Sequence, residues 1–316
     1  MAAVRDKGTP ACVGLDPLIE RLPENLRKKH AIDTAATDAC GADARSRIAN
    51  AFVEFGQGVI RAVAPHVPAI KINIAFFERY HTEGIRAYHE LVQASHEAGL
   101  IVIGDVKRAD IGHTSMQYAI AQLGGEGIPP SAVADAITIN PYFGSDGVAP
   151  FIEVAHAQNR GLFVLVQTSN PSASEVQGLT LPDGLTVCQH VAKLVQTWAA
   201  GEGLIGDSGY SCVGAVVSPR DLESTVRIRE LMPNCIFLVP GFGAQGRTAG
   251  EVAKCFKEDG TGALVTASRS VIYAFNDPKY GDAHGDHWRA CVEAACKDLV
   301  VALRDAVGIT GAKTPH

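Results

Sequence analysis

Short apolar runs alternate with helix-like segments eight times along this chain of 316 residues. The runs are almost continuously apolar, which is typical of parallel strands that are buried on both faces. They span residues 11–16, 67–73, 100–107, 136–141, 161–168, 212–218, 236–241 and 263–269. The helix-like segments span residues 45–63, 84–98, 114–123, 146–157, 186–200, 219–231, 248–256 and 286–306. This alternation predicts an α/β fold in which helices cover a parallel sheet.

Eight such units, without a linker or a change in composition, favour a closed (β/α)8 barrel, the TIM barrel, over an open doubly wound sheet. We therefore expect a single domain over residues 1–316 that ends in a helix at about 286–306. Two segments interrupt the alternation. One is a polar insert at about 17–44 after the first strand, and the other is a loop rich in Ser, Gly and Pro at 169–185. The open sheet is the alternative architecture.

Charge and cysteine usage limit the class of protein. The net charge of −6 argues against general binding to nucleic acid or to a membrane surface. The N-terminal residues lack an apolar signal core, and no run of 18 apolar residues is present. The eight cysteines are scattered without a C-x-x-C pair, which is typical of reduced thiols. We expect a cytoplasmic protein without nucleic-acid or membrane partners, and a secreted disulfide-bonded protein is the alternative.

Charged residues stand at the ends of two neighbouring buried strands. The third strand runs into GDVKRADIGHT (104–114), which contains Asp105, Lys107 and Asp110, and the second strand ends near Lys71. Residues two apart on a strand point the same way, and the carboxyl ends of barrel strands form the face that carries active sites. These four side chains can therefore form an alternating array in which the carboxylates keep the lysines protonated. A structural salt-bridge network at the barrel mouth and a catalytic array both fit this spacing.

A second group of residues indicates a phosphate site. The segment PGFGAQGR (240–247) follows the seventh strand, where glycines leave backbone N–H groups accessible beside the Gln245 amide. Arg269 at the end of the eighth strand adds a cationic fork. Barrels often bind phosphate between these two strand ends, so the pair favours a phosphorylated ligand over a simple turn.

Six motifs lie between residues 11 and 275: KINIAFFE (71–78), DVKRADI (105–111), NPYFGSD (140–146), TSNP (168–171), PGFGAQG (240–246) and SRSVIYAF (268–275). Taken together, they resemble orotidine 5′-phosphate decarboxylase in its longer form. One turn departs from the pattern: SPRD (218–221) follows the sixth strand, where we expect a Gly-Ala-Thr-like turn.

The resemblance implies decarboxylation of orotidine 5′-monophosphate to uridine 5′-monophosphate in de novo pyrimidine biosynthesis, without a metal or an organic cofactor. It makes Lys71, Asp105, Lys107 and Asp110 the catalytic residues. The Lys107 ammonium would stabilise the carbanion at C6 and then donate its proton. In this family the last Asp of the motif comes from the other subunit, so the resemblance also implies a homodimer with shared active sites, in which Asp110 completes the partner's array.

The resemblance also assigns substrate contacts, position by position. Asp16 and Asn73 would contact the ribose and the array, Ser169 the pyrimidine amide, and Gln245 and Arg269 the phosphate. The full set of expected substrate-binding residues is Asp16, Asn73, Ile111, Thr114, Thr168, Ser169, Gln245 and Arg269. Ordinary hydrogen bonding at strand ends is the alternative for Asn73 and Ser169.

Two other functions stay open at the level of sequence. A sugar-phosphate aldolase or decarboxylase of the same superfamily would use the same array with Mg²⁺, and a catalytically silent barrel would only bind nucleotide. The segment DAHGDHW (282–288) groups His and Asp, but its place before the last helix favours capping and a solvated turn over a metal site. We predict no metal site.

Overall fold

Eight parallel strands form a closed barrel in the computed structural model of the chain. The structure describes residues 1–32, 41–220, 222–242, 249–281 and 287–308. Each strand pairs with the next in chain order, and β8 closes the barrel by pairing with β1. The strands are β1 (Ala11–Leu15), β2 (Ala69–Asn73), β3 (Ile101–Arg108), β4 (Ala136–Ile139), β5 (Gly161–Gln167), β6 (Val213–Val217), β7 (Phe237–Pro240) and β8 (Ala263–Ala267). The predicted (β/α)8 barrel is confirmed, and the open sheet is wrong.

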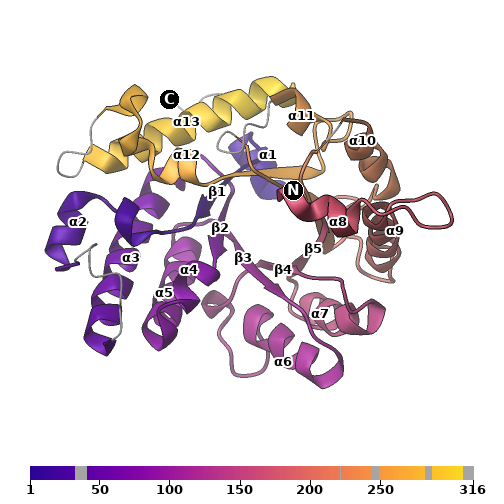
Figure 1. Cartoon of the computed structure of the whole chain (residues 1–316), viewed down its shortest axis with the longest axis horizontal. Coiled ribbons are helices and arrows are strands. Elements are labelled where there is room, and N and C mark those ends of the chain that lie inside the picture. The colour runs from indigo at the N-terminus through magenta and orange to yellow at the C-terminus, as the bar shows by residue number, and fades with distance from the viewer. Residues whose placement is uncertain (33–40, 221, 243–248, 282–286, 309–316) are drawn as a thin grey trace.

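Helices surround the strands, as Figure 1 shows. One main helix follows each strand: α3 (Ala42–Val63), α5 (His81–Glu97), α6 (Gly112–Leu123), α7 (Ser145–Ala157), α9 (Val187–Ala199), α10 (Leu222–Leu231), α11 (Ala249–Ala253) and α13 (Trp288–Val307). The shorter α-helices are α1 (Ala2–Lys7), α2 (Glu24–Lys29), α4 (Ala75–Glu78), α8 (Ser174–Gln177) and α12 (Arg269–Ile272). Within the described ranges, no helix combines the length and the apolar sequence that crossing a bilayer requires, and no disulfide joins the cysteines.

The core has two layers because alternate strand residues face opposite sides of the barrel wall. Outside the wall, helices such as α3 bury one apolar face, and Ile48, Phe52, Phe55 and Val59 recur there at helical spacing. Inside the wall, a separate apolar cluster fills the barrel, formed by Cys12, Ala69, Ile103, Ala136, Phe163, Val216 and Leu238. The polar strand ends therefore stand on a packed floor.

β1 passes close to the residue that follows β8. A Cβ atom on Gly14 would lie 1.9 Å from the Ser268 hydroxyl oxygen, so a larger residue here would force the Ser268 side chain to move. The eighth strand is shorter than the predicted 263–269, because β8 ends at Ala267 and the chain turns at Ser268. Arg269 is consequently the first residue of α12 rather than the last of a strand.

The two interruptions have structure of their own. The insert at 17–44 contains a 3-10 turn at Ile19–Arg21 and the helix α2, and residues 33–40 lie outside the described part. The loop at 169–185 contains a 3-10 turn at Pro171–Ala173 and the helix α8. Thr186 then starts α9 with a capping box, in which its side chain and that of Gln189 each bond the other's backbone N–H.

Candidate active site

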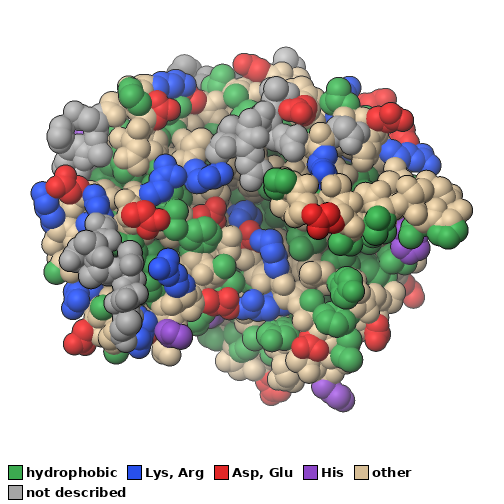
Figure 2. Space-filling view, in the orientation of Figure 1, with side chains coloured by type: hydrophobic (Ala, Val, Ile, Leu, Met, Phe, Trp, Pro, Cys, Tyr) green, Lys and Arg blue, Asp and Glu red, His purple; other side chains and the backbone are tan. Residues whose placement is uncertain are grey.

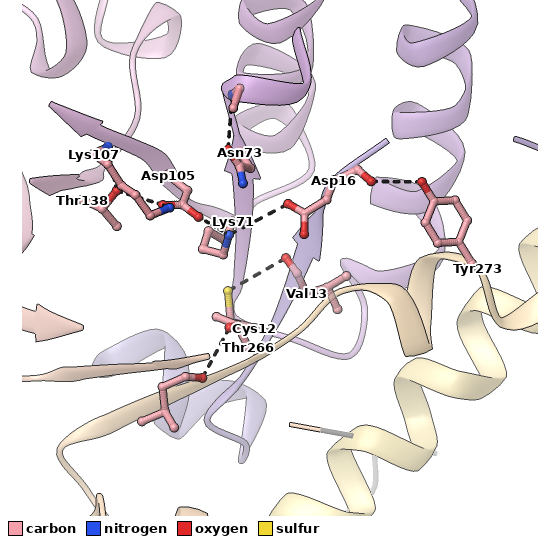
Figure 3. A network of polar contacts seen from close by, with 12 residues as sticks. Cys12, Val13, Asp16, Lys71, Asn73, Asp105, Lys107, Thr138, Thr266 and Tyr273 are labelled. Atoms are coloured by element: carbon pink, nitrogen blue, oxygen red, sulfur yellow. Dashed lines mark hydrogen bonds and ion pairs between the residues drawn. The ribbon is translucent and has the colours of Figure 1, made fainter. Parts of the chain in front are cut away.

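Polar side chains from β1, β2 and β3 meet at the carboxyl end of the barrel. Lys71 is buried near the end of β2, Asp105 is buried in β3, and Asp16 follows directly after β1. The parallel register pairs Gly14 with Lys71 and Asn73 with Asp105. Since these strands end at the same level, the side chains point toward one another, as Figure 3 shows. Figure 2 shows charged side chains of both signs around the hollowed centre of this face.

The Asp105 carboxylate is the centre of the polar network. Its Oδ2 accepts a hydrogen bond from Lys71 Nζ at 2.6 Å, and its Oδ1 accepts one from Lys107 Nζ at 2.5 Å. The Thr138 hydroxyl donates a third bond, to Oδ1 at 2.9 Å. Lys71 Nζ also lies 4.0 Å from Asp16 Oδ1, so the charges alternate in the order Asp16, Lys71, Asp105, Lys107.

This alternation keeps all the buried charges ionised. Burial alone would raise the pKa of Asp105, but the ammonium groups of Lys71 and Lys107 outweigh it and hold that pKa well below its usual range. Burial alone would lower the pKa of Lys71, but Asp16 and Asp105 outweigh it and raise that pKa. Beneath Lys71, burial raises the pKa of the Cys12 thiol to about 12, so Cys12 stays neutral and is no nucleophile.

Lys107 has an unusual backbone conformation. Its φ of 47° lies in the left-handed region, which non-glycine residues rarely adopt and which recurs at functional sites. The β3–β4 ladder shifts register there, pairing Gly104 with Ile137 and then Arg108 with Ile139. The Lys107 N–H bonds the Thr138 hydroxyl at 3.0 Å. The Lys107 side chain is 49% exposed, so its ammonium faces the open mouth while Lys71 stays buried.

A cavity of about 180 Å³ opens above the network. Its charged wall is formed by Lys71, Asp105 and Lys107, and the opposite wall is largely apolar. The remaining lining residues are Thr138, Leu165, Thr168, Ser169, Val216, Leu238, Pro240 and Thr266. A flat ligand with one polar edge fits this division, because the apolar wall can contact its face while the ammonium groups contact the edge.

The loop after β5 brings Thr168 and Ser169 to this cavity, and their contact with a substrate stays a prediction. Gln177 on α8 holds Thr168 in place from two sides: its Oε1 accepts the Thr168 N–H at 3.0 Å, and its Nε2 donates to the Thr168 hydroxyl at 2.7 Å. Below, the Gln167 amide donates to the Ser218 carbonyl at 2.7 Å, which joins this loop to the SPRD turn. Asp221 of that turn lies outside the described residues.

Asp110, Ile111 and Thr114 do not reach the network of their own chain. Asp110 is half-buried on the turn before α6, where its Oδ1 accepts the Ile111 N–H at 2.8 Å. Among the described residues it forms no ion pair with Lys71 or Lys107, and Ile111 and Thr114 are exposed. Within one chain, the second carboxylate of the array beside Asp105 is therefore that of Asp16 and not that of Asp110.

The other residues predicted to contact the substrate differ in where they lie. Asn73 stands above Lys71, and its Oδ1 accepts the Ala75 N–H at 3.2 Å, so it also organises the turn into α4. Arg269 is exposed on α12 and has no ion pair with any described residue. Gln245 lies outside the described residues, and so does most of DAHGDHW. In the part of the chain that is described, no three His, Cys, Asp or Glu side chains form a metal-binding group.

Two residues of the site have no counterpart in the sequence expectations. Thr138 bonds both Asp105 and Lys107, and Tyr273 fixes Asp16 by donating to the Asp16 carbonyl at 3.0 Å. Thr138 carried one signal, since it is the only polar residue in the run AITI. Tyr273 lies in the motif SRSVIYAF, but nothing in the sequence links it to Asp16, which is 257 positions away along the chain.

Comparison with known proteins points to one family. Residues 12–280 match the sequence model of the orotidine 5′-phosphate decarboxylase / HUMPS family. The orotidine 5′-phosphate decarboxylase of Rhodopirellula baltica is 39% identical over 93% of this chain and 94% of its own length. That of Caldicellulosiruptor saccharolyticus is 34% identical over 89% and 90%, respectively. The solved structure of Leishmania donovani OMP decarboxylase superposes with a TM-score of 0.71 at 27% identity, covering 97% of this chain and 98% of that one. The family model alone covers most of the barrel, and the relatives cover nearly all of it, so the chain belongs to the orotidine 5′-phosphate decarboxylase / HUMPS family, as its strand-end motifs predicted.

Proposed function

We propose that this chain decarboxylates orotidine 5′-monophosphate to uridine 5′-monophosphate, in pyrimidine biosynthesis and in the cytoplasm. The names of its relatives support the substrate. The observation that carries the chemistry is the Asp105 carboxylate, held between the Lys71 and Lys107 ammonium groups on one wall of the cavity.

The reaction needs positive charge next to one carbon atom. Loss of CO₂ from C6 leaves an electron pair in the pyrimidine plane, where the ring π system cannot stabilise it. The Lys107 ammonium supplies this stabilisation electrostatically. It then donates a proton to C6, so that the electron pair left behind by CO₂ forms the new C6–H bond. Its partly exposed side chain can reach the ligand, whereas Lys71 is buried and holds Asp105 in place.

Asp105 has two roles in this proposal. It fixes the Lys107 ammonium, and its negative charge faces the substrate carboxylate, a repulsion that ends as CO₂ leaves. We rank preorganisation by fixed charges above this repulsion, because charges that are already in place need no reorganisation during the reaction.

We propose that the reaction requires no metal ion. The Mg²⁺-dependent alternative needs carboxylate oxygens that are open to the ion. Both oxygens of Asp105 already accept hydrogen bonds from ammonium groups, and Lys71 lies between Asp105 and Asp16. The charge that a metal would supply is present as Lys107.

We assign the phosphate to Arg269 with Gln245, and the ribose to Asp16 and Asn73. Arg269 has a free guanidinium among the described residues, on the element that directly follows β8. Asp16 Oδ1 is buried without a hydrogen-bond partner, and a ribose hydroxyl would satisfy it. Thr168 and Ser169 would bond the pyrimidine edge from the opposite wall.

A homodimer with shared sites completes the proposal. Large exposed apolar side chains gather beside Asp110, on and between α6 and α7: Ile111 (52% exposed), Tyr118 (37%), Tyr142 (83%) and Phe143 (49%). Figure 2 shows hydrophobic side chains on this part of the face. Ser115 joins the two elements, because its hydroxyl lies 2.8 Å from the Asp110 carbonyl oxygen and 2.9 Å from that of Gly147 and shares its one proton between them. A second copy that covers this patch would bring Asp110, Ile111 and Thr114 towards a neighbouring mouth.

The test is direct. The purified protein is incubated with orotidine 5′-monophosphate in EDTA, and the loss of substrate absorbance is followed with Lys107→Ala as the control. Turnover by the wild type alone supports the proposal. Binding of uridine 5′-monophosphate without turnover would indicate a silent nucleotide-binding barrel. Turnover of a hexulose phosphate with Mg²⁺, and none of orotidine 5′-monophosphate, would contradict the proposal in favour of the aldolase class.

A further inference from the structure

Thr138 is the only residue of β4 whose side chain enters the polar network. It is 1% exposed and stands on the inner side of the barrel wall, where it lines the cavity with Asp105 and Lys107. The other three residues of the strand, Ala136, Ile137 and Ile139, are apolar and buried. A buried hydroxyl at this position must be hydrogen-bonded to offset its desolvation.

The direction of both bonds of Thr138 is determined by its partners. An ionised carboxylate only accepts, so the single hydroxyl proton goes to Asp105 Oδ1 at 2.9 Å. A backbone N–H only donates, so the hydroxyl oxygen accepts from Lys107 N at 3.0 Å. One hydroxyl thus links the carboxylate that orients the Lys107 ammonium to the backbone that carries the same lysine.

The bond to Lys107 replaces a missing ladder contact. The β3–β4 pairing jumps from Gly104–Ile137 to Arg108–Ile139, so three residues of β3 stand against one of β4. Such a bulge leaves backbone groups without a strand partner. At Lys107 the chain takes the left-handed φ of 47°, and the Thr138 hydroxyl accepts the N–H that this turn redirects.

We propose that Thr138 is a positioning residue: its hydroxyl holds the Asp105 carboxylate and the Lys107 backbone in the arrangement that presents the Lys107 ammonium to the substrate. This inference rests on the proposed decarboxylation. Without the hydroxyl, Asp105 Oδ1 keeps only the Lys107 ammonium as a donor, and the Lys107 N–H has no acceptor inside the wall. The ammonium then samples several positions instead of one, which lowers kcat rather than affinity.

The test compares two substitutions that separate the effect of the hydroxyl from the effect of side-chain shape. Thr138→Val removes the hydroxyl and keeps the shape, and Thr138→Ser keeps the hydroxyl and removes only a methyl group. We expect kcat of Thr138→Val to fall about 10- to 150-fold, which is the change in rate that corresponds to losing a hydrogen bond to a charged group. We expect its affinity for uridine 5′-monophosphate to change by less than about threefold, and kcat of Thr138→Ser to stay within about threefold of wild type. Thr225→Val on α10 is the matched control for a buried Thr outside the site, with kcat unchanged.

A second readout does not depend on catalysis. Hydrogen exchange of the Lys107 amide, followed by NMR on folded protein, should accelerate in Thr138→Val and not in Thr138→Ser or Thr225→Val. If Thr138→Val does not fold, Thr138→Ala takes its place with the same expectations.

The outcomes separate the two proposals. Unchanged kcat and unchanged Lys107 exchange in Thr138→Val would overturn the positioning role while leaving the decarboxylase assignment intact. An equal loss of kcat in Thr138→Ser would also overturn it, because the loss would then follow packing and not the hydroxyl. If wild type does not turn over orotidine 5′-monophosphate, the decarboxylase assignment fails, and the Lys107 exchange rates still decide whether Thr138 holds the bulge.

Discussion

Neutralising the central carboxylate should destabilise the whole barrel. In Asp105→Asn the amide oxygen can accept from one ammonium group, but the amide NH₂ then faces the other. Lys71, which is 8% exposed, would keep its buried charge with only Asp16 nearby, at 4.0 Å. Breaking a buried ion pair in this way lowers the free energy of unfolding by about 3–5 kcal/mol. The half-exposed Lys107 ammonium is rehydrated, so the loss of its ion pair adds only about 0–1 kcal/mol to this destabilisation.

The measurement is the free energy of unfolding in urea, at a fixed protein concentration because association would contribute to it. Asp207→Asn, at an exposed loop position, removes the same charge and should change the free energy by less than about 0.5 kcal/mol. A loss below about 1 kcal/mol in Asp105→Asn would refute the reasoning, because the desolvation of the pair would then cancel its attraction.

The pH dependence gives an independent check of the same pair. The pKa of Asp105 is lower in the folded than in the unfolded protein, so its stabilisation is complete above the unfolded value of about 3.9 and is lost as the pH falls through the folded value. The pKa of Lys71 is raised, so its stabilisation is complete below about pH 10.4 and is lost as the pH rises through the folded value. Asp105→Asn should therefore show a shallower loss of stability than wild type below about pH 4.

Three further substitutions test the proposed chemistry. Lys107→Ala should lower kcat by many orders of magnitude in a folded protein, since it removes both the stabilising charge and the proton; more than a few per cent residual activity would place the chemistry elsewhere. Arg269→Ala should weaken binding of the phosphorylated substrate by about 1.5–3 kcal/mol and hardly affect a substrate without phosphate; equal losses on both would argue against a phosphate contact. Asp110→Ala and Lys107→Ala homodimers should each be nearly inactive, and mixing them should restore activity towards half of wild type per heterodimer. Subunit exchange, verified with a tag on one chain, without any rescue would refute the shared site.

Several features of the site could be predicted from local sequence. Asp105 and Lys107 share a strand face because side chains alternate along a strand, and Lys71 follows the neighbouring strand, so their convergence needed only the barrel hypothesis. Thr168 and Ser169, which the resemblance singled out, line the same cavity. The prediction of strands overextended the eighth strand to Arg269, because an apolar run does not reveal that the backbone turns at Ser268, where β1 and β8 are in close contact.

Asp110 illustrates what spacing cannot resolve. Its position three residues after Lys107 allowed an array within one chain, but the turn before α6 leads it away from both lysines. The turn is tied to the packing of α6 against α7, because the Ser115 hydroxyl lies within hydrogen-bond distance of both the Asp110 and the Gly147 carbonyl oxygens. The role of Asp110 in a neighbouring site remains a prediction.

The sequence by itself determined the eight strand–helix units, the face of the barrel on which the polar strand ends converge, and the family. These depend on the period of apolar residues and on short motifs, both of which are local. Only the tertiary structure decided that Thr138 links Asp105 to Lys107, that Tyr273 holds Asp16, and that Lys107 adopts a left-handed backbone. These contacts join residues that are 31 to 257 positions apart. They arise only when the whole barrel closes, because closure sets the register between neighbouring strands and so decides which side chains meet.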